Sequence, residues 1–586
     1  MRSRAYFPPI LIFAVGASLC YWLWSRTGEI LLDFGNELYT AWQLSQGKVL
    51  YRDIAYPYGP LSPTINATVM RVFGPSLTTI LTANLFVLIL TTALLYRLLR
   101  IIAGPFTATV ATICFLCIFA LSTPTRLTNY NFLTPYSHPI IHGFLLCLGT
   151  IACLDWFYRR RSQSAVILGG LLTGLAFLTK PEIFLGCAAT YLLGLVAANY
   201  LTSAKSLPAL LIDAVIAILL PPLATYLTYA SQMPIHTALD GVLSGWQFIN
   251  KPYVVSTPFY KGSFGTDAPF ANSIRMFACA ALYAAAASVL AIVALIIRRR
   301  SAILPVASAL AVVGYFSLTE AGNYFDSFWP DAGCGLPLFS IFALILIFFR
   351  LTSARADFKV GRKTLLEWSL AILSLAFLTK IFLFSRTYHY GFILAVPAGM
   401  LAVIALLDWL PNWIQRRGGS RTIIQFGAIS LLAAFVSHNL VLTHEVLAER
   451  TMPIPLILGG TAWTRPTNSA AVAAINWLAH TTATAVVIPD SVGINYAAGR
   501  PSSIPYTELN PMSLAMSGPD NVLAAFDRNP PDFILLMDFP EPAFGARTFG
   551  RDYALPLSHW IAQHYRRIAT FHGGEHPIDL WKRKGH

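Results

Sequence analysis

The feature that most constrains the fold of this chain is a series of apolar runs, each about twenty residues long and most of them almost free of charge. An α-helix of roughly 20 apolar residues is long enough to cross the hydrocarbon core of a bilayer. Only 12% of the 586 residues are charged, whereas about 25% is typical of soluble domains. The sequence therefore predicts a mostly α-helical membrane protein that crosses the bilayer many times.

Applying this length criterion along the chain predicts about thirteen spans. They are expected at 7–25, 76–97, 101–121, 139–157, 164–180, 183–200, 208–229, 273–297, 302–319, 334–350, 365–384, 391–409 and 422–442. Basic clusters such as 159–161 and 298–300 occur at alternate connections between these spans. Because such clusters mark cytoplasmic loops, the N-terminus is predicted inside and the C-terminus outside.

The net charge of +14 does not indicate a nucleic-acid-binding protein. Residues 443–586 contain 11 basic and 12 acidic residues, so the whole surplus of positive charge belongs to residues 1–442. There it lies in short clusters between apolar runs, as the loops of a membrane protein require. A nucleic-acid partner would need a basic face on a soluble domain, and the sequence predicts none.

At about residue 443 the long apolar runs end, and shorter predicted helices and strands follow. Two domains are predicted on that basis. Residues 1–442 form the transmembrane domain, and 443–586 form a small soluble α/β domain outside the membrane. Within the second domain, "NSAAVAAINWLAH" and "LPLSHWIAQHY" are typical of amphipathic helices. "TAVVIPD" and "PDFILLMDF" are typical of short buried strands.

The first outer loop, 26–75, departs from the general avoidance of charge. It contains "DFGNELYTAWQLSQGKVLYRD", which places Asp33, Glu37 and Asp53 within twenty-one residues of one another. If this stretch is helical, Asp33 and Glu37 lie one turn apart on the same face. One interpretation is ordinary loop solvation, with Asp33 capping a short helix. The other is a catalytic site, in which a partly desolvated carboxylate with a raised pKa acts as a general base.

Basic residues also occur near predicted outer ends of spans, against the usual bias of positive charge toward the cytoplasm. The phrase "LAFLTK" ends at Lys180 and again at Lys380, and "SRTYHYG" adds Arg386 and His389. A lysine near a helix end can simply extend to the lipid headgroups. The alternative is that these residues bind the phosphate of a lipid-linked substrate.

Three acidic residues on the predicted outer side of the membrane are candidates for a metal site. Glu182, Asp326 and Asp331 would provide oxygen ligands for a divalent cation, Mg²⁺ or Mn²⁺, if two or three of them converged. If they do not converge, they bind no metal and have structural roles. Glu182 is also a candidate for substrate binding. No other cofactor is predicted.

The acidic loop resembles that of the polytopic GT-C glycosyltransferases, in which an N-terminal span precedes a loop of the form "D…E…Y.AW.L..G..LYRD……GPL". The resemblance is to the bacterial group related to protein O-mannosyltransferases and to the aminoarabinose transferase of lipid A. It extends to "GLLTGLAFLTKPE", "SRTYHYGFILAVP" and "VVIPDSVGINYAAGRPSS". It implies a helical bundle of about thirteen spans with a C-terminal domain outside the membrane. It also places Asp33 at the position of the proposed base. In the more usual pattern of the family a second acidic residue is adjacent to that base, whereas here Glu37 is four positions away.

The resemblance implies an inverting enzyme of the bacterial inner membrane, with its C-terminal domain in the periplasm. Its partners would be a polyprenyl-phosphate-linked sugar donor, membrane lipid, and an envelope glycan, lipid or protein that supplies an acceptor hydroxyl. Asp33 would remove the proton of that hydroxyl. Lys180, Lys380 and Arg386 would meet the charge of the departing phosphate, with His389 as a hydrogen-bond donor.

Two other functions stay open beside this one. A transporter or flippase for lipid-linked saccharides would need charged or helix-breaking residues near the bilayer midplane, whereas the predicted spans are almost free of charge. A non-catalytic assembly or ligase-type protein would need no base, and replacing Asp33 with Asn distinguishes it from an enzyme.

Overall fold

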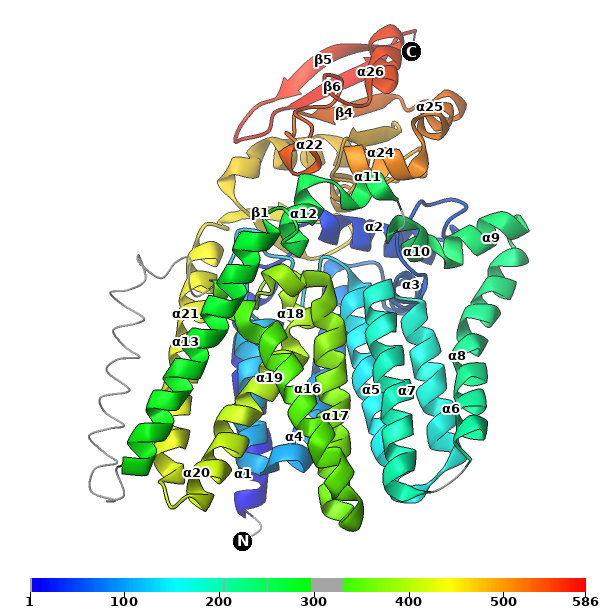
Figure 1. The fold of residues 1–586 in the computed structure, drawn as a ribbon. Coiled ribbons are helices and arrows are strands. Elements are labelled where there is room, and N and C mark those ends of the chain that lie inside the picture. The colour runs from blue at the N-terminus through cyan, green and yellow to red at the C-terminus, as the bar shows by residue number, and fades with distance from the viewer. Residues whose placement is uncertain (1–2, 204–205, 250, 297–329, 586) are drawn as a thin grey trace.

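The computed structural model describes residues 3–203, 206–249, 251–296 and 330–585. Most of these residues are in helices that run roughly parallel to one another and form a bundle, and the C-terminal region lies on one end of that bundle (Figure 1). We call this end the near end and the opposite one the far end. The arrangement confirms the predicted fold class, a mostly helical membrane bundle with a small C-terminal sheet.

Nine long helical segments among the described residues are apolar enough to cross a membrane. The helices of the bundle are α1 (Ser3–Leu23), α4 (Leu77–Cys114), α5 (His138–Arg160), α6 (Gln163–Phe177), α7 (Pro181–Thr202), α8 (Leu207–Ala230), α13 (Pro269–Ile296), α16 (Leu336–Ser353), α17 (Phe358–Leu378), α18 (Gly391–Leu394), α19 (Val396–Ile404), α20 (Leu410–Arg416) and α21 (Arg421–Ala448). A π-helix (Phe115–Ala120) extends α4, another (Ala405–Trp409) joins α19 to α20, and a 3-10 helix (Thr379–Phe384) extends α17. The predicted span at 302–319 lies outside the described residues.

Two predicted spans, 76–97 and 101–121, are found as the two arms of α4, which run in opposite directions on either side of Gly104. Gly104 interrupts α4 with φ +78°, a conformation that glycine adopts at little cost, and Pro105 follows it. Both ends of the element lie at the near end: Leu77 N donates to Gly459 O, and Thr123 N, just past the π-helix, donates to Thr443 Oγ1. The chain therefore turns back at the far end of the bundle.

Shorter helices lie at the near end of the bundle (Figure 1). The first outer loop contributes α2 (Asp33–Ser45) and α3 (Leu61–Phe73). The segment between α8 and α13 contributes α9 (Ile235–Val242), α10 (Ser244–Ile249), α11 (Pro252–Val255) and α12 (Pro258–Phe264). Together with the loop at 121–137, these helices lie between the membrane-spanning part and the C-terminal region.

The C-terminal region contains one mixed sheet and one hairpin. The sheet has the order β3–β4–β6–β5, formed by Ala485–Ile488, Phe533–Met537, Ile578–Arg583 and Tyr565–Phe571. Strands β3 and β4 are parallel, and β6 is antiparallel to both β4 and β5. The hairpin pairs β1 (Met452–Pro455) with β2 (Thr461–Thr464). The helices of the region are α22 (Ser469–Ala479), α23 (Gly493–Ala497), α24 (Pro511–Ser517), α25 (Pro519–Arg528) and α26 (Leu555–His564).

The predicted helices and buried strands of this region are found as α22, α26, β3 and β4. The predicted domain boundary at 442/443 falls inside α21, which continues to Ala448.

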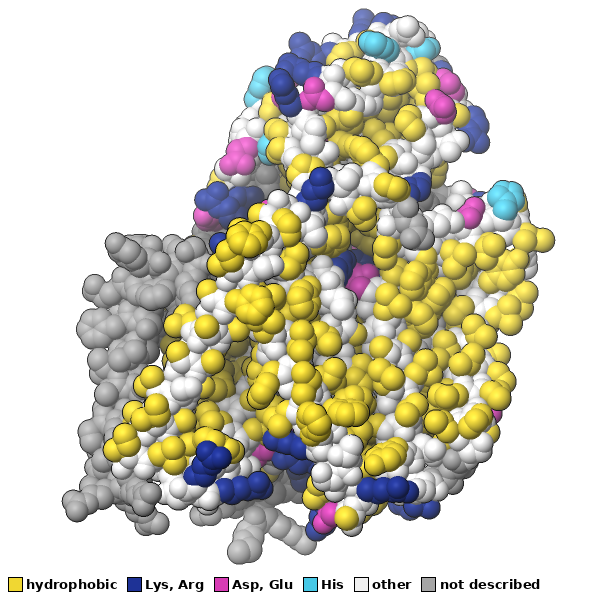
Figure 2. Space-filling model, in the orientation of Figure 1, with side chains coloured by type: hydrophobic (Ala, Val, Ile, Leu, Met, Phe, Trp, Pro, Cys, Tyr) yellow, Lys and Arg dark blue, Asp and Glu magenta, His cyan; other side chains and the backbone are white. Residues whose placement is uncertain are grey.

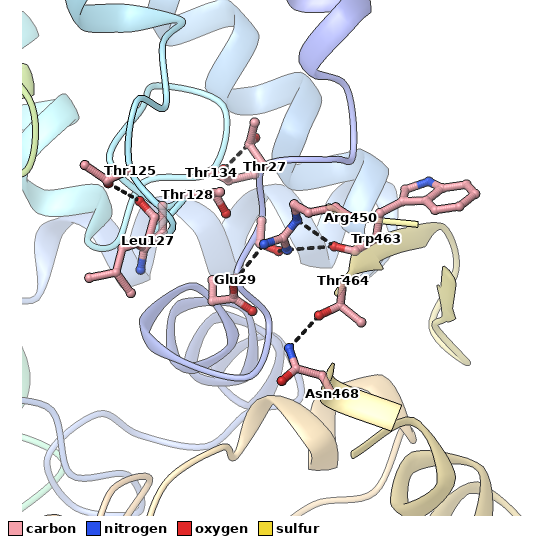
Figure 3. A network of polar contacts seen from close by, with 12 residues as sticks. Thr27, Glu29, Thr125, Leu127, Thr128, Thr134, Arg450, Trp463, Thr464 and Asn468 are labelled. Atoms are coloured by element: carbon pink, nitrogen blue, oxygen red, sulfur yellow. Dashed lines mark hydrogen bonds and ion pairs between the residues drawn. The ribbon is translucent and has the colours of Figure 1, made fainter. Parts of the chain in front are cut away.

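A buried arginine ties the C-terminal region to the first outer loop (Figure 3). Arg450, just past α21, donates from Nη1 to Glu29 Oε2 at 2.8 Å and from Nη2 to Gly28 O at 2.7 Å. Its Nε and Nη2 also donate to Trp463 O in β2. Because both members of the Arg450–Glu29 pair are almost fully buried, the two parts are joined by a charged contact that water does not screen.

The surface of the bundle shows a broad apolar band (Figure 2). Basic side chains gather below this band at the far end, and further charged side chains lie above it on the C-terminal region. This distribution fits a bundle that crosses a membrane between two charged faces.

Candidate active site

Asp33 occupies the first position of α2, the helix that contacts the C-terminal region through Asn36 and Glu508. Its Oδ2 accepts a hydrogen bond of 2.9 Å from Asn129 Nδ2, and the described part of the chain provides no donor to Oδ1. The side chain is exposed to solvent, yet enough protein surrounds it that burial raises the pKa of Asp33 to about 6, partly offset by Asn129 and Lys180. An accessible carboxylate with this pKa is suited to accept a proton near neutral pH.

Glu37, one turn further along α2, is buried and fully engaged. Its Oε1 accepts a hydrogen bond of 2.9 Å from Tyr56, and its Oε2 lies 2.7 Å from His138 Nδ1. Asn84 Nδ2 donates to Leu133 O at 2.9 Å and lies 3.1 Å from His138 Nε2. Since Nε2 must then accept, we assign the proton of His138 to Nδ1, which donates to Glu37. Glu37 thus fixes α2 against α5, and its catalytic role stays a prediction.

Asp53 lies in the loop after α2 and is bound by neighbours in that same loop. It forms an ion pair of 2.8 Å with Arg52 and accepts a hydrogen bond of 2.8 Å from Val49 N. The contacts of the described residues place neither Asp33 nor Lys180 beside it. The three acidic residues of the loop therefore have different surroundings, and the catalytic role predicted for Asp53 has no support from these contacts.

Lys180, between α6 and α7, is a buried ammonium group that forms no ion pair with any described residue. Its Nζ donates to Tyr136 OH at 3.1 Å and lies 3.8 Å and 4.4 Å from the ring centres of Tyr58 and Tyr136. Burial lowers the pKa of Lys180 to about 7, and nearby carboxylates including Glu182, Glu37 and Asp33 partly oppose that effect. A desolvated cation close to Asp33 is a natural site for an anion.

Lys380 and Glu182 form an ion pair of 2.7 Å that joins the 3-10 helix after α17 to the start of α7. Lys380 Nζ also lies 4.5 Å from the ring centre of Tyr390. The repeated phrase "LAFLTK" therefore ends at the near end of the bundle in both copies. The two lysines nevertheless differ, because Lys380 has a carboxylate partner and Lys180 has none among the described residues.

Arg386 and His389 lie together in the loop between α17 and α18. Arg386 Nη2 is 3.2 Å from His389 Nδ1, and Arg386 Nε is buried with no hydrogen-bond partner in the part of the chain that the structure describes. Burial, together with Arg386 and Lys380, holds the pKa of His389 well below its usual range. Because Nδ1 of the neutral ring accepts from Arg386, we assign the ring proton to Nε2, which is then able to donate to a ligand.

Aromatic rings connect these charged groups into one site. The ring centre of Tyr130 is 4.4 Å from that of His389 and 4.9 Å from that of Tyr136, which receives the Lys180 hydrogen bond. Tyr136 also packs on Tyr390 at 5.6 Å. The structure therefore brings Asp33, Lys180, Glu182, Lys380, Arg386 and His389 to the same end of the bundle.

The C-terminal region adds three carboxyl groups that sequence reasoning did not find. Glu508 accepts hydrogen bonds from Asn36 Nδ2 on α2 and from Ser513 Oγ. Burial and the charge of Asp33 raise the pKa of Glu508 to about 7. Burial and Glu508 raise the pKa of Glu541 to about 8, and the pKa of Asp490 is raised for the same reasons. No short motif links these residues to Asp33, so only the fold reveals them.

A metal site is not formed by the described residues, among which no three His, Cys, Asp or Glu side chains lie close enough to share an ion. Of the candidates for such a site, Asp326 and the side chain of Asp331 lie outside the described residues. Glu182 is engaged with Lys380 instead.

Comparison with solved structures identifies the architecture. The chain superimposes on ArnT from Cupriavidus metallidurans bound to undecaprenyl phosphate with a TM-score of 0.53 and 13% identity, covering 98% of each chain. The chain has the GT-C glycosyltransferase fold. The apo state of the same ArnT gives a TM-score of 0.52 at 13% identity and covers 99% of this chain and 98% of that one. The oligosaccharyltransferase of Archaeoglobus fulgidus gives 0.48 at 12% identity, covering 90% of this chain and 69% of that one. No protein-family model and no curated protein sequence matches the chain.

Within this GT-C fold, the first outer loop supplies α2 and therefore Asp33 at the near end of the bundle. The loop at 121–137 supplies Asn129, Tyr130 and Tyr136, which sequence reasoning passed over. Their only signal in the sequence is a loop rich in aromatic and amide side chains, "TNYNFLTPYSHP".

Proposed function

We propose that this chain is a membrane glycosyltransferase that moves a sugar from a polyprenyl-phosphate donor to a hydroxyl acceptor, with Asp33 as general base. The observation that carries the proposal is the proximity of two groups. Asp33 is accessible and has a raised pKa, and it feels the charge of Lys180, a buried cation without an ion-pair partner among the described residues. The GT-C fold, shared with an ArnT that was crystallised with undecaprenyl phosphate, supports a lipid-linked donor.

The transfer is a single displacement at the anomeric carbon. As the acceptor oxygen forms its bond to that carbon, its proton passes to Asp33, and the bond from the carbon to the phosphate oxygen breaks with its electron pair. One such displacement inverts the anomeric configuration. Oδ1 of Asp33 is the oxygen that we assign to the proton, because Oδ2 already accepts from Asn129.

The departing phosphate gains negative charge, and two cations are placed to receive it. Lys180 Nζ has bonding capacity left beyond its contact with Tyr136, and Arg386 Nε is buried and has no partner among the described residues. Preorganised donors of this kind stabilise developing charge strongly because little water surrounds them. We assign His389 Nε2 as a further donor. Lys380 is already paired with Glu182, so we assign it a smaller share in stabilising the charge of the phosphate.

Two acidic residues of the first loop have supporting roles or none in this scheme. Glu37 is a positioning residue, since its bonds to Tyr56 and His138 hold the start of α2 in place. Asp53, engaged with Arg52, lies outside the scheme.

We further propose that the site faces the periplasm of a bacterium, with the far end of the bundle in the cytoplasm. The basic side chains that gather at the far end support this orientation (Figure 2). A transporter is less well supported, because acidic side chains near the far ends of described spans, such as Asp155 and Asp408, pair with Arg362 and Lys363. Because they are paired, neither of these two carboxylates is free to relay a substrate across the bilayer.

The test is donor consumption by the purified full-length protein in lipid nanodiscs. A panel of polyprenyl-phosphate sugars is incubated with the protein together with membrane extracts as a source of acceptors, and release of free polyprenyl phosphate is measured. We expect one donor to be consumed, with release abolished in Asp33→Asn. Mass spectrometry of the product then shows whether the acceptor is an envelope glycan, a lipid or a protein. Movement of an intact donor across vesicles without release of polyprenyl phosphate would instead establish a transporter.

A further inference from the structure

A large apolar groove lies between α1 and α4, apart from the candidate active site. Its volume is about 990 Å³, and its lining includes none of the charged residues of that site. Small residues are part of its lining: Gly16 and Ala17 on α1, and Ala93 on α4. A Cβ added at Gly16 would meet only Leu116 Cδ1, at 3.5 Å. The groove is therefore a genuine hollow in the membrane-facing part of the bundle.

The dimensions of the groove suit a hydrocarbon chain. It extends along α1 from Pro9 to the segment just past Leu23, which at 1.5 Å per helical residue is about 20 Å. One leaflet occupies about half of the roughly 30 Å hydrocarbon core. A single acyl chain that enters from one leaflet thus fits along it.

The end of the groove nearest the C-terminal region has a different chemistry. Arg26 is the one charged residue among those that line the groove, and Trp22 and Trp24 lie beside it. The guanidinium of Arg26 is exposed and 5.9 Å from the ring centre of Trp463, and no acidic residue of the described chain pairs with it. Tryptophan is enriched at the level of the headgroups, and a guanidinium matches the geometry of a phosphate.

We propose that this groove binds an anionic phospholipid, with one acyl chain between α1 and α4 and the phosphate at Arg26. The apolar length of the groove fits the acyl chain, and Arg26, which pairs with no acidic residue of the described chain, attracts the negatively charged headgroup. Trp463, above Arg26, accepts through its carbonyl oxygen the hydrogen bonds of Arg450, which joins the C-terminal region to the first loop. The bound headgroup therefore braces the same junction.

The proposal is tested on the full-length protein in mild detergent by native mass spectrometry, with phosphatidylglycerol and phosphatidylcholine of identical acyl chains as the probes. We expect the wild type to retain one phosphatidylglycerol about tenfold more tightly than phosphatidylcholine, equivalent to about 1.4 kcal/mol. Gly16→Leu and Ala93→Leu fill the groove from opposite walls and should each abolish the tightly bound lipid. Arg26→Gln should leave one lipid bound while equalising the two affinities.

The matched controls are Ala285→Leu, at an exposed position of α13, and Arg126→Gln, which removes an exposed arginine. Both should bind lipid as the wild type does. Lipid that stabilises the native state should also raise Tm, and this increase should disappear in the two groove variants. The proposal is overturned if the wild type shows no preference for phosphatidylglycerol. It is equally overturned if both groove variants, with their helical content intact, still hold the lipid.

Discussion

One buried charge at the near end of the helical bundle lacks, within the described part of the chain, the ion-pair partner that buried charges at the far end have. At the far end, Asp155 is bound by Arg362 at 2.6 Å and by Arg159 at 3.1 Å, and Lys363 binds Asp408 at 2.8 Å. At the near end, Lys180 is buried without an ion-pair partner among the described residues. Paired charge serves the fold, whereas unpaired buried charge costs stability and persists where a ligand uses it.

A similar contrast exists on the single helix α2. Glu37 has its oxygens engaged by Tyr56 and His138, whereas Asp33 has one bond from Asn129 and an accessible oxygen. Both residues are acidic and lie on the same face of the helix, so neither property distinguishes their roles. The number of hydrogen bonds that each carboxylate already accepts does distinguish them, and substitutions can test this difference.

The largest expected effect is that of Asp33→Asn. Losing the base should lower the rate of sugar transfer by about 10²–10⁴-fold, while donor binding and Tm stay close to those of the wild type because the amide keeps the shape of the side chain. Turnover is measured as release of polyprenyl phosphate, and folding by thermal unfolding. A variant that turns over at the wild-type rate would show that Asp33 is not the base.

Lys180→Met should lower kcat by about 10²–10³-fold, as expected when one preorganised charge donor is lost. Tm should stay unchanged or increase, because a buried unpaired ammonium is replaced by an apolar side chain of similar length. Lys180→Arg restores the charge and should recover part of the activity. A fall in both Tm and activity for Met, with no recovery for Arg, would assign Lys180 to the fold instead.

The pH profile of kcat/KM should be bell-shaped and narrow. Asp33 acts as a base only when ionised, so activity should rise through pH about 6. Lys180 attracts phosphate only when protonated, so activity should fall above pH about 7. Outside this window the rate should change about tenfold per pH unit. In Lys180→Arg the alkaline limb should disappear, since an arginine does not deprotonate there; a persisting limb would assign it to another group.

At the far end, Asp155→Asn should lower stability and leave activity unchanged, in contrast to the variants of Asp33 and Lys180. Removing the buried carboxylate that binds both Arg159 and Arg362 leaves two partly buried cations uncompensated and should lower the free energy of unfolding by about 3 kcal/mol. The rate per folded molecule should stay at the wild-type value, because Asp155 is remote from the site. Denaturation in detergent, combined with assays of the folded fraction, checks both statements. Loss of specific activity at unchanged stability would contradict the contrast between the two ends.

The smallest expected effect is that of Asp53→Asn. The Arg52–Asp53 pair is partly exposed, and such pairs contribute about 0–1 kcal/mol. We expect activity within about twofold of the wild type and a Tm shift of only a few degrees. The matched comparison is Asp33→Asn in the same loop. A large loss of activity in Asp53→Asn would return this residue to the catalytic scheme.

The membrane-spanning helices could be predicted from the sequence because length and hydropathy are local properties. The runs that became α5, α7 and α8 match their predicted ranges within a few residues. Strands β5 and β6 were missed, since the central residues of β5, "RRIA", are exposed and give no apolar alternation. The two predicted spans 76–97 and 101–121 already implied a reversal of the chain between them, and the structure places the break in α4 at Gly104.

The candidate site could be predicted only in part, because its residues come from segments that are far apart in the sequence. Asp33 and Lys180 stood out because they lie near predicted outer ends of spans, and positive charge at such ends runs against the usual cytoplasmic bias. Asn129 and Glu508 did not, because amide and acidic residues are ordinary in outer loops and their value lies in their distance from Asp33. Nor did the sequence distinguish Lys180 from Lys380, since the partner of Lys380 is Glu182, 198 positions away.

The neighbourhood of Glu508 has a consequence for the fate of the proton. The ionised Asp33 helps to hold the pKa of Glu508 near 7, so near neutrality one of the two groups carries a proton while the other is charged. When Asp33 becomes neutral, Glu508 becomes the stronger acid and dissociates. If Asp33 is the base that we propose, each proton that it accepts therefore favours the loss of a proton from Glu508, a residue of the C-terminal region.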